Sequence, residues 1–231
     1  RRKAKTFTQI PGTPIAYWAS DALLEAFKEE KIGDVCLLRT GMKTGDNDRF
    51  LRLWWEPSHL KEKMDCTNDA EAIESGMKWF PYNKGGEYRK WFGNNDWVVN
   101  FENDGSELLG DAASDGRHIQ NLDKSLRFKP SLTWSLISSG SIAFRFRPSG
   151  SLYDMAGMSM FPNCFPDYVL GLANSSFSLM CLSFLAPTLN YQVGDIARIP
   201  YVGDIAEAVL GKVNGAVRNS ISLSMSDWDS L

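Results

Sequence analysis

Apolar and polar side chains alternate in two runs between Ser131 and Arg147, and this pattern constrains the fold of the chain most strongly. Successive side chains of a β-strand point to opposite faces, so each run predicts a strand with one apolar face. A three-residue loop, Ser138–Gly140, places Trp134 opposite Phe144, whereas a two-residue turn would mix the faces. That loop also puts Gly140 where such hairpins need a left-handed residue. The predicted hairpin therefore has a solvent-facing polar side that carries Ser131, Thr133, Arg145 and Arg147.

Other segments predict a mixture of helices and strands. Ser20 is a suitable N-cap for a helix over 20–31 that ends before Gly33, and its apolar stripe contains Leu23, Leu24 and Phe27. Residues 49–55 and 97–101 are strand-like, and the second strand leads into the turn Asn103-Asp104-Gly105. The aperiodic segment 106–120 predicts a mobile surface loop. A buried helix is expected within 167–185, and an amphipathic helix within 204–217.

These elements predict an α+β fold, in which an antiparallel sheet of β-hairpins is flanked by helices near both ends. We expect residues 1–33 to form a linker and an N-terminal helix, with 10–15 held extended by its prolines. Residues 34–202 would form one mixed domain, and 203–231 a C-terminal helix with a cut end at 224–231. Because the chain starts at Arg1 without Met, we expect a fragment of a longer protein.

Charge and cysteine content limit the class of protein. The net charge of -3 argues against a free-standing DNA binder, but not against a module that reads bases while a partner domain contacts phosphates. Four scattered cysteines without a secretory signal indicate reduced thiols in the cytoplasm. Residues 167–185 are apolar, but Asn174 and several serines interrupt them, so a buried helix is favoured over a membrane span.

No residue pattern indicates catalysis. His59 and His118 each stand alone in a polar context, typical of solvated surface histidines. The acidic residues after Gly45 lack the glycine and glutamate of a calcium loop, so we expect no metal. The loop Gly41–Gly45 lacks the Gly-Lys-Ser/Thr ending of a phosphate-binding loop. The sequence therefore predicts recognition, with no catalytic residue and no cofactor in this chain.

Two polar segments are candidates for that recognition. The first is a glycine-punctuated loop that leads into a strand and offers Lys43, Thr44, Gly45, Asp46 and Asn47. The second, Lys78–Asn95, interleaves cations, amides and aromatic residues around Gly85-Gly86. Such a mixture suits nucleic acid, because cations hold phosphate, amides read base edges and aromatic rings stack on bases. It also suits a carbohydrate-binding face or an ordinary loop packed on tryptophan.

Six segments follow one another in a characteristic order, namely Arg39–Trp54, Lys78–Asn95, Asn100–Gly105, Thr133–Gly140, Phe161–Pro162 and Pro187–Pro200. In this order they resemble the C-terminal target-recognition region of adenine-specific DNA methyltransferases. The similarity is greatest to those of the BREX (phage-growth-limitation) defence systems, which are related to fused type II restriction-modification enzymes, and it runs from about Ile10 to the end.

The resemblance implies that an upstream domain of the same polypeptide binds S-adenosylmethionine and methylates adenine N6, while this chain selects the DNA sequence. It implies double-stranded DNA as a partner, with other defence-system subunits as further candidates. The expected DNA-facing residues are Lys43, Thr44, Gly45, Asp46, Asn47, Lys84, Arg89, Lys90, Asn94, Asn95, Thr133, Arg145 and Arg147. The alternatives are a protein-interaction module that docks through its tryptophan-rich surface, and a carbohydrate-binding module.

Overall fold

Two four-stranded sheets form the centre of the computed structural model, which describes residues 20–114, 122–138, 140–164 and 166–230. The strand order is β1-β8-β5-β6 in the first sheet and β2-β4-β3-β7 in the second. All of these pairs are antiparallel except β3 with β7. The strands are β1 (Cys36–Arg39), β2 (Leu51–Leu53), β3 (Trp79–Asn83), β4 (Trp97–Asn100), β5 (Ser131–Trp134), β6 (Phe144–Arg147), β7 (Leu152–Tyr153) and β8 (Ser159–Pro162).

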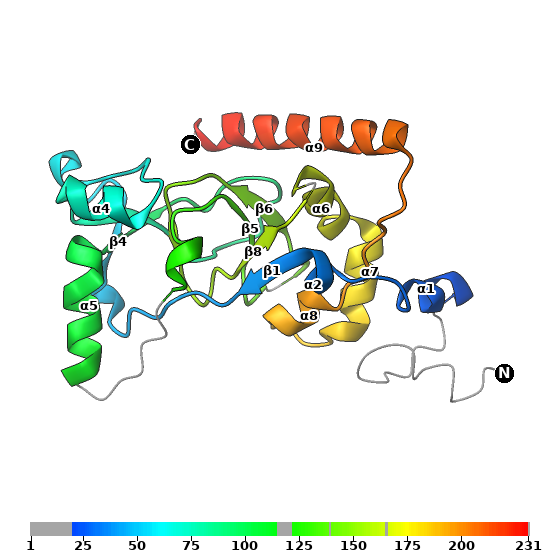
Figure 1. Ribbon diagram of the computed structural model, residues 1–231, viewed down its shortest axis with the longest axis horizontal. Coiled ribbons are helices and arrows are strands. Elements are labelled where there is room, and N and C mark those ends of the chain that lie inside the picture. Colours follow the sequence, from blue (N-terminus) through cyan, green and yellow to red (C-terminus); the bar gives the residue numbers. More distant parts are fainter. Residues whose placement is uncertain (1–19, 115–121, 139, 165, 231) are drawn as a thin grey trace.

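Helices surround the sheets and give the predicted α+β fold (Figure 1). The two helices α4 and α5 lie beside β4 at one end of the molecule, whereas α1, α2, α7 and α8 gather at the other end. The long helix α9 runs past α6 along one side. The helices are α1 (Asp21–Ala26), α2 (Ile32–Val35), α3 (Asn47–Phe50), α4 (Asp69–Ser75), α5 (Glu102–Ser114), α6 (Pro166–Ala173), α7 (Ser176–Leu185), α8 (Val193–Ala197) and α9 (Glu207–Trp228).

The first core lies between the β1-β8-β5-β6 sheet and the helices that cover it. Trp134 is fully buried there, packs against Phe144 at a ring-centroid distance of 5.9 Å, and donates its Nε1–H to the Tyr191 carbonyl at 2.9 Å. The side chain of Asn174 exchanges hydrogen bonds of 3.0 and 2.9 Å with the backbone N–H and C=O of Phe144. The junction between α6 and α7 is thereby held against the edge of β6.

The hairpin between β5 and β6 has the predicted register but not the predicted loop. Trp134 pairs with Phe144, and Ser131 pairs with Arg147. The three-residue loop is wrong, because the strands end at Trp134 and resume at Phe144, and the Leu136 N–H donates instead to the Ala156 carbonyl. Gly140 is not left-handed. The expected solvent-facing side is also wrong, because the second sheet and its loops cover it and leave all four polar residues buried.

The second core lies behind the β2-β4-β3-β7 sheet and is rich in phenylalanine. The Phe80 ring lies 6.5 Å from that of Phe101 and 5.7 Å from that of Phe128. The predicted turn after β4 is present, since residues 103–105 are all left-handed, and a side chain at Gly105 would meet the Phe101 ring at 2.6 Å. The loop expected from residue 106 is wrong up to Ser114, because the chain continues as α5, and residues 115–120 lie outside the described part.

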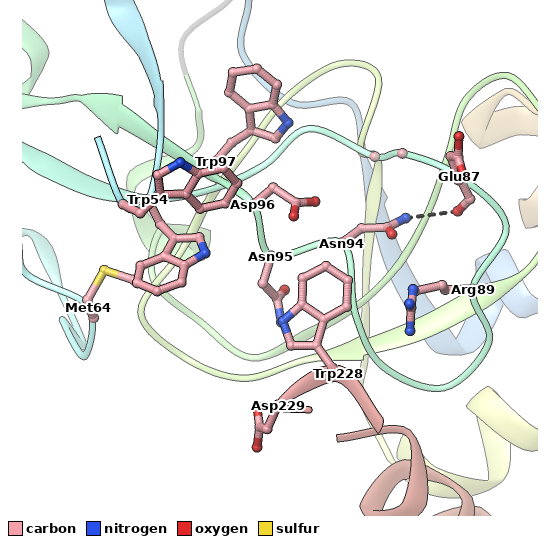
Figure 2. Close-up of a pocket in the computed structure, with 13 residues that line it drawn as sticks. Trp54, Met64, Glu87, Arg89, Asn94, Asn95, Asp96, Trp97, Trp228 and Asp229 are labelled. Carbon is pink, nitrogen blue, oxygen red and sulfur yellow. Dashed lines mark hydrogen bonds between the residues drawn. The ribbon is translucent and has the colours of Figure 1, made fainter. Parts of the chain in front are cut away.

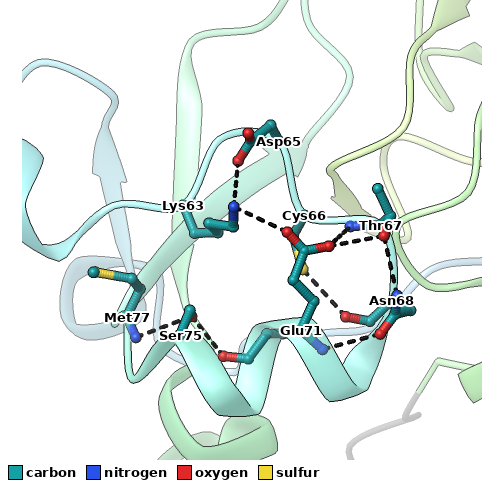
Figure 3. Close-up of polar contacts among 9 residues, drawn as sticks. Lys63, Asp65, Cys66, Thr67, Asn68, Glu71, Ser75 and Met77 are labelled. Atoms are coloured by element: carbon teal, nitrogen blue, oxygen red, sulfur yellow. Dashed lines mark hydrogen bonds and ion pairs between the residues drawn. The ribbon is translucent and has the colours of Figure 1, made fainter.

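A polar network stabilises the excursion between β2 and β3, which consists of residues 54–78 (Figure 3). The Lys63 ammonium contacts Asp65 at 2.7 Å and Glu71 at 2.9 Å. Glu71 also accepts hydrogen bonds from the backbone N–H and the hydroxyl of Thr67 at 2.9 and 2.8 Å. These partners, with Lys63 first, lower the pKa of Glu71 to about 2. Asn68 caps the first turn of α4, so this helix is fixed at its N-terminus.

Several predicted elements differ in length. Ser20 caps α1 as predicted, but this helix ends at Ala26, and Gly33 lies inside α2. The strand expected over 49–55 is shorter, because Asp46 caps the short helix α3 and β2 covers only Leu51–Leu53. The helix expected within 204–217 is confirmed as part of α9, which continues to Trp228. The linker 10–15 lies outside the described residues.

The apolar segment 167–185 forms two mostly buried helices, not one. The chain bends by 63° between α6 and α7, where Ser175 caps the second helix. In the described part of the chain, no single helix has the length and apolarity needed to cross a membrane. Among the described residues, this bent pair meets that criterion when its two helices are taken together, by length and composition alone.

Candidate nucleic-acid interface

A cleft of about 960 Å³ opens between the segment that follows β2, the loop between β3 and β4, and the end of α9 (Figure 2). Four tryptophans line it, together with amides, carboxylates and one guanidinium. The lining residues are Trp54, Trp55, Met64, Gly85, Gly86, Glu87, Arg89, Asn94, Asn95, Asp96, Trp97, Trp228 and Asp229.

The second sheet positions the tryptophans on one wall of this cleft. The Trp54 N–H donates to the Asp96 carbonyl at 2.8 Å, which continues the β2-β4 pairing by one step and places Trp54 and Trp55 at its end. The two indoles meet edge to face at 5.6 Å. Trp54 is 41% exposed and Trp55 is 54% exposed. Indoles with this much free surface are available for stacking with a ligand.

The opposite wall is a rigid loop around Gly86. Asn94 is buried and donates its Nδ2–H to the Glu87 carbonyl at 2.9 Å, while the Ser135 hydroxyl donates to the Gly86 carbonyl at 2.8 Å. Gly86 has a φ of +135°, and a Cβ there would lie 2.8 Å from the Asn94 side chain. Glycine is therefore required for this close approach.

The end of α9 closes the cleft with a stacked cation. The Arg89 guanidinium lies 4.9 Å from the ring centroid of Trp228 and forms an ion pair with Asp227 at 3.0 Å. Gly93 allows this packing, since a Cβ there would lie 3.0 Å from the Trp228 ring and 2.8 Å from the Arg89 side chain. Residues distant in sequence are thus joined at one site.

The floor of the cleft presents a polar edge. The buried Arg147 donates to Asn95 Oδ1 at 2.8 Å and to the Ser151 hydroxyl at 2.6 Å. Because a guanidinium carries only donors, this contact fixes the Asn95 amide with its NH₂ group directed elsewhere. The neighbouring Asp96 carboxylate also lines the cleft, and burial raises its pKa. Burial lowers the pKa of Arg147 to about 9.

The structure joins the first predicted loop to the start of the second. Asn47 Oδ1 accepts hydrogen bonds from the Thr44 hydroxyl at 2.6 Å and from the Lys84 ammonium at 3.1 Å. The Lys84 ammonium also lies 3.7 Å from the buried carboxylate of Asp154. Lys43 is exposed, whereas Thr44 is buried. Thr44, Asn47 and Lys84 therefore form a small polar cluster, and Lys84 directly precedes Gly85 of the cleft lining.

Other members of the predicted DNA-facing set have structural partners. Asp46 accepts from the Arg49 N–H at 3.1 Å as the cap of α3, next to the left-handed Gly45. The Lys90 ammonium donates to the Asn174 carbonyl at 3.2 Å.

Thr133 and Arg145 are buried between the sheets, where a ligand cannot reach them without rearrangement. The Thr133 hydroxyl donates to the Met158 carbonyl and accepts from Asn83 of the other sheet. Arg145 donates to the Arg89 carbonyl and the Ser135 hydroxyl, and burial lowers its pKa to about 10. Together with Arg147 these residues hold loops and strands in place, so their expected position on an accessible face is wrong.

The sequence interpretation missed the residues that form the centre of the cleft. Trp54, Trp55, Asp96 and Trp228 were not among the predicted contacts. The paired tryptophans at the end of a strand, next to acidic and amide side chains, were the available signal. Trp228 carried no such signal, because only the packing of α9 brings it to this place.

The chain is similar in sequence to known proteins over nearly its whole length. It is 36% identical over 236 residues to the adenine-specific methyltransferase PglX of Lacticaseibacillus casei strain Zhang, a match that covers 100% of this chain and 19% of that protein. It is 34% identical over 230 residues to the adenine-specific methyltransferase BrxX of Escherichia coli O9:H4 strain HS, covering 96% of this chain and 17% of that protein. The chain thus spans about a fifth of each relative. No family model matches it.

Proposed function

The chain belongs to the family of adenine-specific methyltransferases named PglX and BrxX, of which it matches one segment, and on that basis we propose that it selects the DNA sequence to be methylated. In this proposal the polypeptide that contains the chain acts in phage defence or restriction-modification and transfers a methyl group to adenine N6. S-adenosylmethionine and the extruded adenine bind outside this chain, which contributes contacts to the neighbouring duplex.

One observation supports this role above the others. Two loops that lie far apart in sequence meet through Asn47, which binds both Thr44 and Lys84, and the second of these loops then forms a wall of the tryptophan cleft. The surface so formed offers an exposed ammonium for phosphate, amides for base edges and indoles for stacking. Base-edge contacts select the sequence, while phosphate contacts and stacking position and hold the nucleic acid.

An exchange of segments tests this proposal. The matching segment of the Escherichia coli BrxX is replaced by this chain in the strain HS background, and methylated adenines are mapped across the genome. We expect adenine methylation to continue at a different recognition sequence, because the bases are selected by the exchanged segment. The control carries the original segment between the same engineered junctions. A chimera that methylates the same sequence as this control would show that selection resides elsewhere.

A second role is favoured by exposed apolar side chains on the excursion between β2 and β3. Leu60 is 85% exposed and Ile73 is 52% exposed. Side chains of this size on one excursion are typical of a protein-docking surface. We propose that this excursion docks another subunit of the same defence system, separately from the DNA-facing loops. Docking through apolar surface would depend little on salt, in contrast to phosphate binding.

A further inference from the structure

We propose that the tryptophan cleft holds one unpaired nucleobase that has left the DNA helix. This inference rests on the proposed function, because it takes DNA as the ligand. It adds a base-binding site formed by residues of this chain. The cleft combines three properties that favour a base, namely flat apolar faces, a polar edge at the floor, and a lining with more carboxylates than cations, which disfavours phosphate.

The flat faces come from indoles that the protein itself leaves partly uncovered. Trp54 and Trp55 stand at right angles, with an interplanar angle of 89°, so each presents a different surface to the cleft. The Arg89 guanidinium already stacks on Trp228 at 4.9 Å, which shows that planar groups are accommodated here (Figure 2). A base has a π face whatever its identity, so stacking on an indole is tolerant of sequence.

The polar edge is formed by adjacent residues of one loop. Arg147 binds Asn95 Oδ1 and so leaves the Asn95 Nδ2–H₂ as a donor. The adjacent Asp96 supplies an acceptor. Within the described residues, no side chain donates a hydrogen bond to its carboxylate. A base carries neighbouring donors and acceptors on its pairing edge, and these become available only when the base is unpaired. The loop thus offers a donor and an acceptor to an edge of this kind.

The charges around the cleft argue against a strand of phosphates inside it. Glu87 and Asp229 lie at its rim, and Arg89 is neutralised by Asp227. Asp96 is close enough to Arg147 for their charges to interact, and Arg145 lies behind the floor. A polyanion would meet the rim carboxylates, whereas an uncharged ring would not. The phosphates on either side of the base would instead lie outside the cleft.

Binding of duplexes with one extrahelical nucleotide tests this inference. The polypeptide that contains this chain is titrated with a duplex that carries a single bulged base, and with the same duplex carrying an abasic bulge. We expect the base to improve the affinity on the order of tenfold, as for stacking of one base on an aromatic side chain. Trp55→Ala and Asp96→Leu should each remove most of this gain, because the first removes the indole and the second removes the acceptor. Trp55→Phe should retain most of it. Leu223→Ala, on an exposed side chain of α9 outside the cleft lining, is the matched control.

Each result separates this inference from the proposed function. Equal affinities for the base and abasic bulges would overturn the base site, even if the segment exchange changes the methylated sequence. A gain that survives Trp55→Ala and Asp96→Leu would also overturn it. A gain that disappears in both variants would support it, and would do so even if the exchanged segment leaves the methylated sequence unchanged.

Discussion

Glu71 connects three parts of the excursion between β2 and β3 through a single carboxylate. It contacts the Lys63 ammonium at 2.9 Å and accepts two hydrogen bonds from Thr67 (Figure 3). Both partners favour the ionised form, with Lys63 the larger influence, and the pKa falls from the usual 4.5 to about 2. Lys63 gains in return, since Asp65 and Glu71 raise the pKa of its ammonium. The group is solvent-exposed, so salt screens part of the interaction.

The lowered pKa predicts how stability depends on pH. The contribution of ionised Glu71 is complete above its ordinary pKa of 4.5 and is lost as the pH falls towards about 2. Glu71→Gln should therefore flatten the acid side of the stability profile between these values. The measurement is urea unfolding across a pH series, with Glu74→Gln on the exposed face of the same helix as the control. An unchanged profile in Glu71→Gln would show that the network does not couple folding to protonation.

At the scale of elements, α9 is held against α6 by a close contact at Gly171. A Cβ on Gly171 would lie 2.9 Å from Val217 Cγ2 and 3.2 Å from Val213 Cγ1, so the two helices approach each other without a side chain between them. Val217 is buried, and Val209 is largely exposed. The face of α9 that contains Val217 therefore packs on α6.

Two glycine substitutions separate helix propensity from packing. Alanine in a helix interior is favoured over glycine by about 0.5–1 kcal/mol. Gly215→Ala in α9 meets open space, so we expect it to raise the free energy of unfolding by about this amount. Gly171→Ala should fail to do so, or lower stability, because its Cβ would displace the valines of α9. Thermal and urea unfolding of both variants provide the test, and equal stabilisation by the two would refute the close contact.

At the scale of the whole molecule, negative charge restricts where DNA phosphates can lie. The chain has a net charge of -3, and several of its cations are already paired, such as Lys78 with Glu102 and Glu107. Lys84 is partly neutralised by Asp154, whereas Lys43 is exposed and faces solvent. Few phosphates can therefore be bound by this chain itself. The rest of the polypeptide would supply most of the affinity for DNA.

The salt dependence of DNA affinity measures how many phosphate contacts this chain contributes. Each phosphate contact contributes about 0.9 to the slope of log affinity against log salt concentration on duplex DNA. In the polypeptide that contains this chain, Lys43→Ala should reduce the slope by about one. Lys84→Ala should reduce it by less, because Asp154 already shares the ammonium. Lys212→Ala, exposed on α9, should leave it unchanged. A slope that is the same in Lys43→Ala and the unaltered protein would remove Lys43 from the interface.

The sequence alone determined local periodicity and local caps. The pairing of Trp134 with Phe144 followed from alternation, Ser20 was identified as a cap, and the left-handed turn after β4 followed from Asn103-Asp104-Gly105. These features depend on neighbours within a few residues, which the sequence displays directly. The resemblance to methyltransferases was also visible in the sequence, because the order of the motifs can be recognised without knowing which residues are in contact.

Only the tertiary structure decided which polar residues are accessible at the surface. Alternation separates the two faces of a strand but does not say what covers each face. Arg145 and Arg147 were therefore expected on an accessible face, whereas loops of the second sheet bury them. Trp228 reaches the cleft because α9 packs on α6 and Gly93 leaves room for its ring. Contacts between residues this far apart in sequence depend on how the sheets and helices pack together, and that packing created the cleft.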